Sequence, residues 1–293
     1  MRQRGMILKG VGGLYTVRLE TGVYECRARG IFRKRGIVPL AGDIVWISEG
    51  MSPGTGEIEA IEPRKNQLIR PPIANLDQLI IVTSLVEPRL NLFIIDKMTA
   101  VAEDKGIEPV LILTKTDLAD PSTVMEIYRK VGIRCFTSSQ SQTDGLDELR
   151  AILGGRISAV SGNSGVGKST LMNRLLPELS LQTADISRKL GRGKHTTRQV
   201  ELFPLSEGGF LADTPGFSTL DVERYERIQK ENLAFCFPEF LENLGHCQFA
   251  SCTHRNEKGC AVLRAVEEGR IAASRHKNYV TMYNEAEKIK DWE

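Results

Sequence analysis

The chain has 293 residues, of which 41% are hydrophobic and 26% charged, and its formal net charge is +2. This composition excludes wholesale disorder and collagen-like repeats, and the length favours two or three modules over one compact core. No apolar run approaches the roughly 18 residues of a membrane-spanning helix, and no signal peptide follows the first residues, so we expect a cytoplasmic protein.

The first 70 residues predict a small β-barrel of the OB type that binds RNA. Apolar and polar residues alternate between glycine-rich turns at 14–19, 24–28, 43–47 and 56–61. Residues 1–72 carry 12 lysines and arginines against 7 acidic residues. Five of these cations lie within nine residues, and we expect them to contact RNA phosphates: Arg27, Arg29, Arg33, Lys34 and Arg35. A solvated surface loop is the alternative interpretation of this short basic run.

Beyond a proline-containing linker that ends near residue 70, apolar strands alternate with helical patterns. We expect strands at 79–84, 110–113, 134–137, 157–160 and 210–212. We expect helices at 92–104, from 122, at 146–153 and at 170–176. This alternation predicts an α/β domain at 71–220 with a mostly parallel sheet covered by helices.

A phosphate-binding loop is the strongest motif in the chain. Residues 162–169 fit G-x-x-x-x-G-K-[ST] between a predicted strand and a predicted helix. Backbone N–H groups and the helix N-terminus would cradle a polyphosphate, Lys168 would reach its β- and γ-phosphates, and Ser169 would ligate Mg²⁺. The predicted phosphate-binding residues here are Gly162, Asn163, Ser164, Gly165, Val166, Gly167, Lys168, Ser169 and Thr170.

Two further motifs indicate that the nucleotide is GTP. Thr114-Lys115-Thr116-Asp117 resembles the guanine-reading N-K-x-D of GTPases, in which the carboxylate accepts N1–H and N2–H₂ of guanine. Thr114 departs from the asparagine of that pattern, which puts one base contact in question. Ser138 and Ser139 follow the next strand and would place a backbone N–H against guanine O6. Asp213-x-x-Gly216 resembles the D-x-x-G motif, with Asp213 near Mg²⁺ and Gly216 at the γ-phosphate.

The order of these motifs is permuted relative to most GTPases, in which the phosphate loop comes first, because here the base reader at 114 precedes the phosphate loop at 162 and the D-x-x-G at 213. A parallel sheet tolerates such a circular permutation, since each motif lies on the loop at the end of its own strand.

Residues between the phosphate loop and the D-x-x-G bear on catalysis. Thr197, with Thr196 as the second choice, is predicted to contact Mg²⁺. Phe217 stands where Ras-like enzymes carry a water-orienting glutamine, so slow intrinsic turnover is expected. We assign the water-orienting role to His195, and a surface-loop histidine is the alternative.

A cysteine cluster follows at the C-terminal end. Cys247, Cys252, His254 and Cys260 lie within fourteen residues and match a closed, structural Zn²⁺ site. His246 could take the place of His254, although it would form a strained adjacent pair with Cys247, and a disulfide is the weaker alternative in a cytoplasmic protein.

The permuted motif order, the basic barrel before it and the cysteine cluster after it resemble the ribosome small-subunit-dependent GTPase A family over essentially the whole chain. The resemblance implies a multidomain protein with an OB-fold at 1–70, a permuted GTPase domain at 71–220 and a mostly helical zinc module at 221–293. It also implies GTP hydrolysis that is stimulated by the small ribosomal subunit during its late maturation, and we expect a monomer away from the ribosome. A non-catalytic RNA-binding scaffold and a P-loop ATPase remain as alternatives, and Asp117 speaks against the second.

Overall fold

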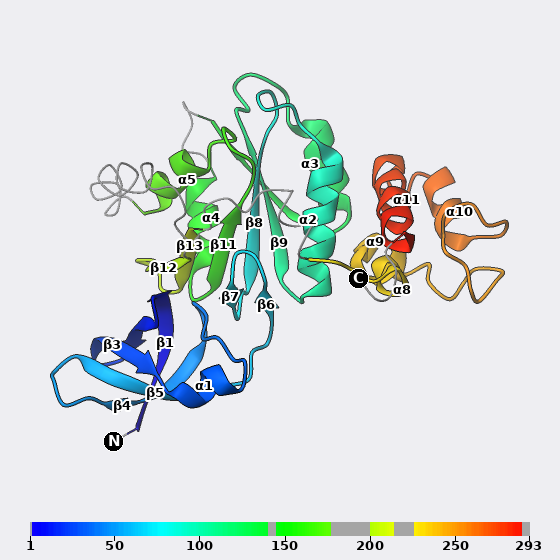
Figure 1. Cartoon of the computed structure of the whole chain (residues 1–293). Coiled ribbons are helices and arrows are strands. Elements are labelled where there is room, and N and C mark those ends of the chain that lie inside the picture. Colours follow the sequence, from blue (N-terminus) through cyan, green and yellow to red (C-terminus); the bar gives the residue numbers. More distant parts are fainter. Residues whose placement is uncertain (1, 140–144, 177–199, 214–225, 289–293) are drawn as a thin grey trace. The chain divides into compact units, whose positions relative to one another are not determined.

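The computed structural model describes residues 2–139, 145–176, 200–213 and 226–288 (Figure 1). The chain divides into two compact units, and each unit is assembled from segments that are far apart in the sequence. The first unit comprises Met1–Leu79, Gly145–Ser161 and Gly167–Phe217. The second comprises Ile80–Asp144, Gly162–Val166 and Ser218–Glu293.

Five strands of the first unit close into a β-barrel, which confirms the predicted N-terminal barrel (Figure 1). They are β1 (Arg2–Val11), β2 (Leu14–Leu19), β3 (Gly22–Ala28), β4 (Ile44–Glu49) and β5 (Thr55–Ile61). The order is β1-β2-β3-β5-β4, and β4 pairs again with β1, so the ring has no open edge. Alternate residues point inward, and the fully buried members include Ile7, Val17, Val45, Ile47 and Ile58.

The sequence did not reveal strand β1, because its first residues are mainly polar and charged. In the structure those charges lie outside the barrel and pair with acidic residues near its surface. Arg2 forms an ion pair with Glu59, and Arg4 Nε lies 2.8 Å from Glu62 Oε1. The apolar half of the alternation begins only at Met6, which is why the strand lacks a clear signal at its start.

The first unit also contains the strands that precede the predicted phosphate loop and the D-x-x-G motif. β11 (Ile157–Ser161) runs parallel to β13 (Phe210–Asp213), and β12 (Glu201–Pro204) pairs antiparallel with β13. β12 was not predicted, and its Glu201 lies opposite Lys9 of β1. Helices were predicted at 146–153 and 170–176, and the corresponding α4 (Leu146–Leu153) and α5 (Lys168–Leu175) belong to this unit. Where the expected linker ends, β6 (Gln67–Leu68) and β7 (Ile73–Ala74) form a short ladder.

Between residues 78 and 138, the second unit contains three strands in the order β10-β9-β8 and two helices. These are β8 (Gln78–Ser84), α2 (Leu92–Asp104), β9 (Glu108–Thr114), α3 (Ser122–Lys130) and β10 (Arg134–Ser138). β9 and β10 are parallel, with Thr114 opposite Ser138 at their carboxyl ends. Nearly every residue of β8 and β9 is buried, as expected for strands covered on both faces.

The C-terminal part of the second unit is helical, as predicted. Its elements are α8 (Lys230–Leu233), the 3₁₀ turn η1 (Ala234–Cys236), α9 (Pro238–Leu241), α10 (Ala261–Glu267) and α11 (Ala273–Glu287). The rings of Phe237, Phe240 and Tyr279 pack in tilted and edge-to-face contacts with centroids 4.9–5.3 Å apart and form the centre of its apolar core. Ala100 of α2 contributes to the same core, so this segment packs against α2.

A buried polar network reinforces that packing. Arg275 of α11 is 1% exposed, donates to Asp96 Oδ1 of α2 at 2.7 Å and pairs with Glu239 of α9. Tyr128 of α3 and Asn278 of α11 donate to the same Asp96 carboxylate at 2.8 and 2.6 Å. Burial lowers the pKa of Arg275, but Glu239 and Asp96 outweigh it and raise the pKa above its usual value, so the guanidinium stays charged.

Among the described residues, none of the helices combines the length and the apolar character needed to cross a membrane.

Candidate functional site

The segment that follows β11 has the backbone of a phosphate loop. Gly162, Gly165 and Gly167 adopt φ angles of +150°, +80° and +96°, which residues with a side chain rarely adopt. A Cβ on Gly162 would lie 2.2 Å from the carbonyl oxygen of Val82, so β8 and this loop approach too closely for any other residue. The glycines of the motif are therefore required by the conformation that the loop adopts.

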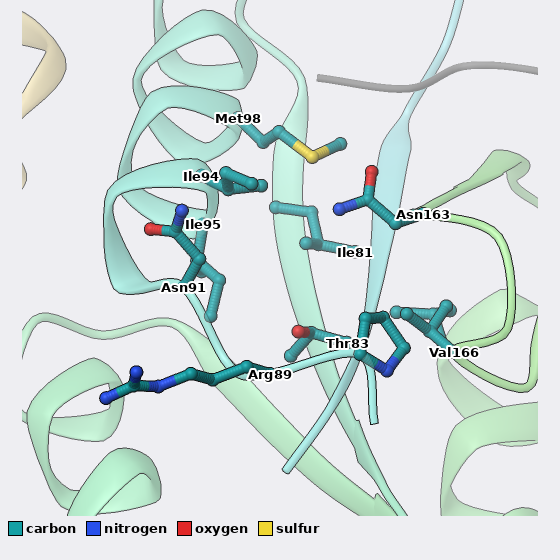
Figure 2. Close-up of a pocket in the computed structure, with 12 residues that line it drawn as sticks. Ile81, Thr83, Arg89, Asn91, Ile94, Ile95, Met98, Asn163 and Val166 are labelled. Atoms are coloured by element: carbon teal, nitrogen blue, oxygen red, sulfur yellow. The ribbon is translucent and has the colours of Figure 1, made fainter. Parts of the chain in front are cut away.

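Residues 162–166 lie against β8 and the start of α2, where a pocket opens (Figure 2). Asn163 and Val166 come from the loop, Thr83 from β8, and Met98 from the buried face of α2. Arg89 also lines the pocket, but its guanidinium points away from it in Figure 2. Residues 162–166 therefore pack against β8 and α2, whose side chains at this pocket are largely apolar.

The predicted guanine-reading loop begins where β9 ends. Thr114 is buried, and its Oγ1 lies 2.6 Å from the carbonyl oxygen of Val166 and 3.2 Å from that of Thr83. Lys115 has φ +59° and its ammonium group donates to the carbonyl oxygen of Glu87. Asp117 is exposed and thus accessible to a base, and Thr116 is partly buried. Thr114 therefore joins the guanine-reading loop directly to the phosphate loop.

Ser138 and Ser139 stand at the end of β10, next to that loop. Ser138 pairs in register with Thr114, and Ser139 is 5% exposed. The second unit therefore brings together all six predicted guanine-site residues and the first five residues of the phosphate loop.

The remaining predicted phosphate and magnesium residues belong to the first unit or lie outside the described residues. Lys168, Ser169 and Thr170 form the first turn of α5, and Asp213 ends β13 opposite Val160 of β11. The first backbone N–H groups of a helix lack intrahelical partners, which suits an anion. His195, Thr196, Thr197, Gly216 and Phe217 lie outside the described residues.

The four predicted zinc ligands converge. One ligand atom from each of Cys247, Cys252, His254 and Cys260 lies within 4.8 Å of the others. The Sγ atoms of Cys247 and Cys260 are 3.9 Å apart, and each is 3.5 Å from Nδ1 of His254. Tetrahedral Zn²⁺ with ordinary bond lengths separates two sulfur ligands by about 3.8 Å and a sulfur from a nitrogen by about 3.6 Å. The residues therefore fit zinc, whereas a disulfide needs sulfurs about 2.0 Å apart.

Without a metal the cluster holds protonated thiols and a neutral imidazole, so a bound Zn²⁺ would have to displace the thiol protons. Burial raises the pKa of Cys252 to about 12 and raises that of Cys260, so without a metal these thiols stay protonated at neutral pH. Burial lowers the pKa of His254, which keeps its ring in the neutral form that binds metals. Backbone N–H groups of Ala261 and Leu263 lie 3.4 and 3.5 Å from the sulfurs of Cys247 and Cys260 and would stabilise thiolates.

Glu257 organises the loop that carries the cluster, a role that the sequence did not indicate. Its carboxylate accepts from the backbone N–H groups of Thr253, Arg255 and Asn256 at 2.8–3.1 Å and from the Thr253 hydroxyl. Although burial alone would raise the pKa of Glu257, these hydrogen bonds lower it to about 2. His246 is not a member of the ligand group.

The five predicted RNA-contacting cations are not equivalent. Arg29 Nε lies 3.1 Å from Glu57 Oε2, and its Nη2 lies 2.6 Å from Glu59 Oε1, so its charge is already paired. The hydrogen bond that Arg29 donates to Glu57 contributes most to the raised pKa of Arg29. Within the described ranges, no carboxylate forms an ion pair with Arg27, Arg33, Lys34 or Arg35, which are all exposed. The last three lie on or just after α1 (Gly30–Lys34).

Comparison with known proteins is consistent with this geometry. A family model described as RsgA GTPase matches residues 61–223, and one described as RsgA N-terminal domain matches residues 4–54. "Small ribosomal subunit biogenesis GTPase RsgA" of Caldanaerobacter subterraneus subsp. tengcongensis is 45% identical over 287 residues, which cover 97% of this chain and 96% of that protein. The Bacillus cereus protein of the same name is 45% identical over 281 residues and covers 94% of each chain.

Solved structures agree with this relationship. The crystal structure of YjeQ from Thermotoga maritima matches with a TM-score of 0.84 at 34% identity and covers 99% of this chain and 100% of that one. The structure of YloQ, which is described as a circularly permuted GTPase, matches with a TM-score of 0.80 at 32% identity and covers 99% and 96%.

Proposed function

This chain belongs to the RsgA family of circularly permuted GTPases, and from that premise we propose that it binds the small ribosomal subunit and hydrolyses GTP to GDP and phosphate during late maturation of that subunit. The relatives that match nearly the whole chain are named for small ribosomal subunit biogenesis. Each predicted module has its own proposed role: residues 1–70 contact RNA, residues 71–220 bind and hydrolyse GTP, and residues 221–293 hold zinc.

The hydrogen bond from Thr114 to Val166 is the observation that carries the proposal. It joins the base-reading loop to a phosphate loop that follows 52 residues later in the chain. Both motifs therefore face one ligand although their sequence order is reversed. Asp117 accepts N1–H and N2–H₂ of guanine, the stem of Lys115 lies along the ring, and the backbone at Ser138 and Ser139 donates to O6. Adenine lacks this donor pair, so GTP is selected over ATP.

Phosphate binding is assigned to residues 162–170 and Gly216. The positive φ angles of Gly162, Gly165 and Gly167 support this assignment, because a loop that curls its backbone around a phosphate group needs residues that adopt such angles. Ser169, Asp213 and Thr197, with Thr196 as the alternative to Thr197, are the residues that would hold Mg²⁺. When bound, Mg²⁺ neutralises charge on the β- and γ-phosphate oxygens. Lys168 adds a positive charge to the same phosphates.

His195 is proposed to orient the attacking water, because Phe217 replaces the glutamine of Ras-like enzymes and phenylalanine offers no hydrogen bond to water. Zn²⁺ is proposed to stabilise the fold of the C-terminal segment through Cys247, Cys252, His254 and Cys260, whose geometry fits it. Contact with ribosomal RNA is assigned to Arg27, Arg33, Lys34 and Arg35, with Arg29 playing a smaller part because it is already paired.

The decisive experiment measures phosphate release from GTP with and without purified small ribosomal subunits, both mature and immature. We expect slow turnover alone and faster turnover with subunits. Absence of hydrolysis under every condition would favour a non-catalytic scaffold, and equal competition by ATP would favour a P-loop ATPase.

A further inference from the structure

The hydroxyl group of Thr114 donates its single proton in a hydrogen bond within the protein. Thr114 is 6% exposed, and both oxygens near its Oγ1, those of Val166 at 2.6 Å and Thr83 at 3.2 Å, are backbone carbonyls that only accept hydrogen bonds. A threonine hydroxyl has one proton, and the shorter contact with Val166 takes it. No proton remains on this side chain for a ligand.

This matters for nucleotide binding because N7 of the guanine base would need a hydrogen-bond donor at this position. Purine N7 is an acceptor, so only a donor can recognise it. The asparagine of the usual N-K-x-D pattern has an amide with two N–H groups, which could serve a loop carbonyl and a base nitrogen together. Threonine can serve one of the two, and in this structure it serves the carbonyl.

The neighbouring side chains favour recognition at the opposite edge of the base. Lys115 directs its ammonium group to the carbonyl of Glu87. Asp117 is exposed and has a carboxylate that accepts two hydrogen bonds at once, which matches N1–H and N2–H₂ of guanine. The selective groups of this loop therefore complement the Watson–Crick edge.

We propose that this chain reads guanine without a hydrogen bond from Thr114 to N7, and that Thr114 is a positioning residue that fixes the guanine-reading loop against the phosphate loop. The inference rests on the proposed function, because it takes GTP and GDP as ligands of this site. The site accordingly accepts guanine nucleotides in which N7 is replaced by carbon.

Binding of GDP and 7-deaza-GDP to the full-length chain tests the proposal without interference from hydrolysis. For the wild type we expect nearly equal Kd values. Thr114→Asn adds a second donor, so we expect it to prefer GDP over 7-deaza-GDP by roughly 5- to 10-fold, which is the usual worth of one hydrogen bond. A wild-type preference for GDP of about threefold or more would overturn the proposal.

Thr114→Val provides a second test that does not depend on a gain of binding. The variant leaves the carbonyl of Val166 without its donor, so we expect both nucleotides to weaken together by about 10-fold, and Thr114→Ser to restore them. Weakening of GDP alone would show that the hydroxyl reads N7 and would overturn the proposal. Failure of the wild type to bind either nucleotide would instead overturn the proposed function, and this inference with it.

Discussion

Among single residues, Asp117 is the one that we propose decides which nucleotide binds. Its carboxylate only accepts hydrogen bonds, whereas an asparagine at this position would present one acceptor and one donor. For Asp117→Asn we expect GDP affinity to fall by roughly 100-fold or more, because hydrogen bonds to a charged group are each worth about 1.5–3 kcal/mol. Xanthosine diphosphate, which has a carbonyl in place of the 2-amino group, should bind the variant more tightly than the wild type.

Competition binding with GDP, xanthosine diphosphate and ADP measures this exchange of preference. The melting temperature of Asp117→Asn provides the control, since an exposed side chain should leave it nearly unchanged. If the variant kept the guanine preference of the wild type, Asp117 would not be the residue that reads the base.

The role proposed for His195 depends on its residue type and its place in the sequence, because it lies outside the described residues. For His195→Ala we expect unchanged GDP affinity and a fall of about 10²-fold or more in the rate of phosphate release with small ribosomal subunits present. Single-turnover phosphate release and nucleotide binding on the same preparation separate the two effects. Unchanged stimulated turnover would remove His195 from the mechanism.

Among the elements, the sequence identified the four helices between residues 92 and 176 and most strands, because their apolar periodicity is strong, whereas α1 and the individual C-terminal helices were not located. The helices at 92–104 and 146–153 have the predicted bounds. Strand β1 was missed because the charges at its start, on Arg2 and Arg4, pair with residues 57 and 58 positions away, and β12 because four residues are too few to show an alternation. The zinc ligands could be predicted from their spacing, but the support from Glu257 depends on a loop conformation that spacing does not determine.

The zinc segment has a pH dependence that follows from its thiols. Burial holds the pKa of Cys252 near 12 and raises that of Cys260, so binding of Zn²⁺ must release their protons. The apparent zinc affinity should therefore rise with pH, by up to about tenfold per pH unit for each proton displaced. Chelator competition between pH 6 and 8 measures the slope, and an affinity that does not change with pH would contradict thiolate coordination.

The helices around the zinc segment depend on the buried charge of Arg275. Replacement of Arg275 by Met would leave the carboxylates of Asp96 and Glu239 buried without their cation. We expect a loss of about 3–5 kcal/mol in the free energy of unfolding, measured by urea denaturation. Lys277→Met, an exposed position on the same helix, is the matched control and should change stability by less than about 0.5 kcal/mol. A loss below about 1 kcal/mol for Arg275→Met would mean that the network contributes little to stability.

Across the whole chain, each compact unit is built from three segments that are separated in the sequence. The base reader, the phosphate loop and the D-x-x-G could each be recognised alone, because each is a local pattern. That the base reader and the first residues of the phosphate loop lie together could be expected only because parallel strands place their following loops at one edge. The hydrogen bond from Thr114 to Val166 could not be foreseen, because it joins residues 52 positions apart and neither local motif specifies it.

The charge of the whole chain is close to neutral, so RNA binding depends on where unpaired cations lie. Each phosphate contact by a lysine or arginine contributes about 0.7–0.9 to the slope of log affinity against log salt concentration. The combined variant Arg33→Ala, Lys34→Ala and Arg35→Ala should therefore reduce the slope for small-subunit rRNA by about 2–3. Filter binding between about 50 and 200 mM salt measures it.

Arg29→Ala is the matched control for these three residues, because it removes a cation from the same face that Glu57 and Glu59 already neutralise. We expect its slope to change by less than about 1, the contribution of one phosphate contact. Equal effects of Arg29→Ala and the triple variant would mean that the ion pairs of Arg29 open on the RNA. An unchanged slope in the triple variant would show that the RNA surface lies elsewhere, since counterion release responds only to cations that meet phosphate.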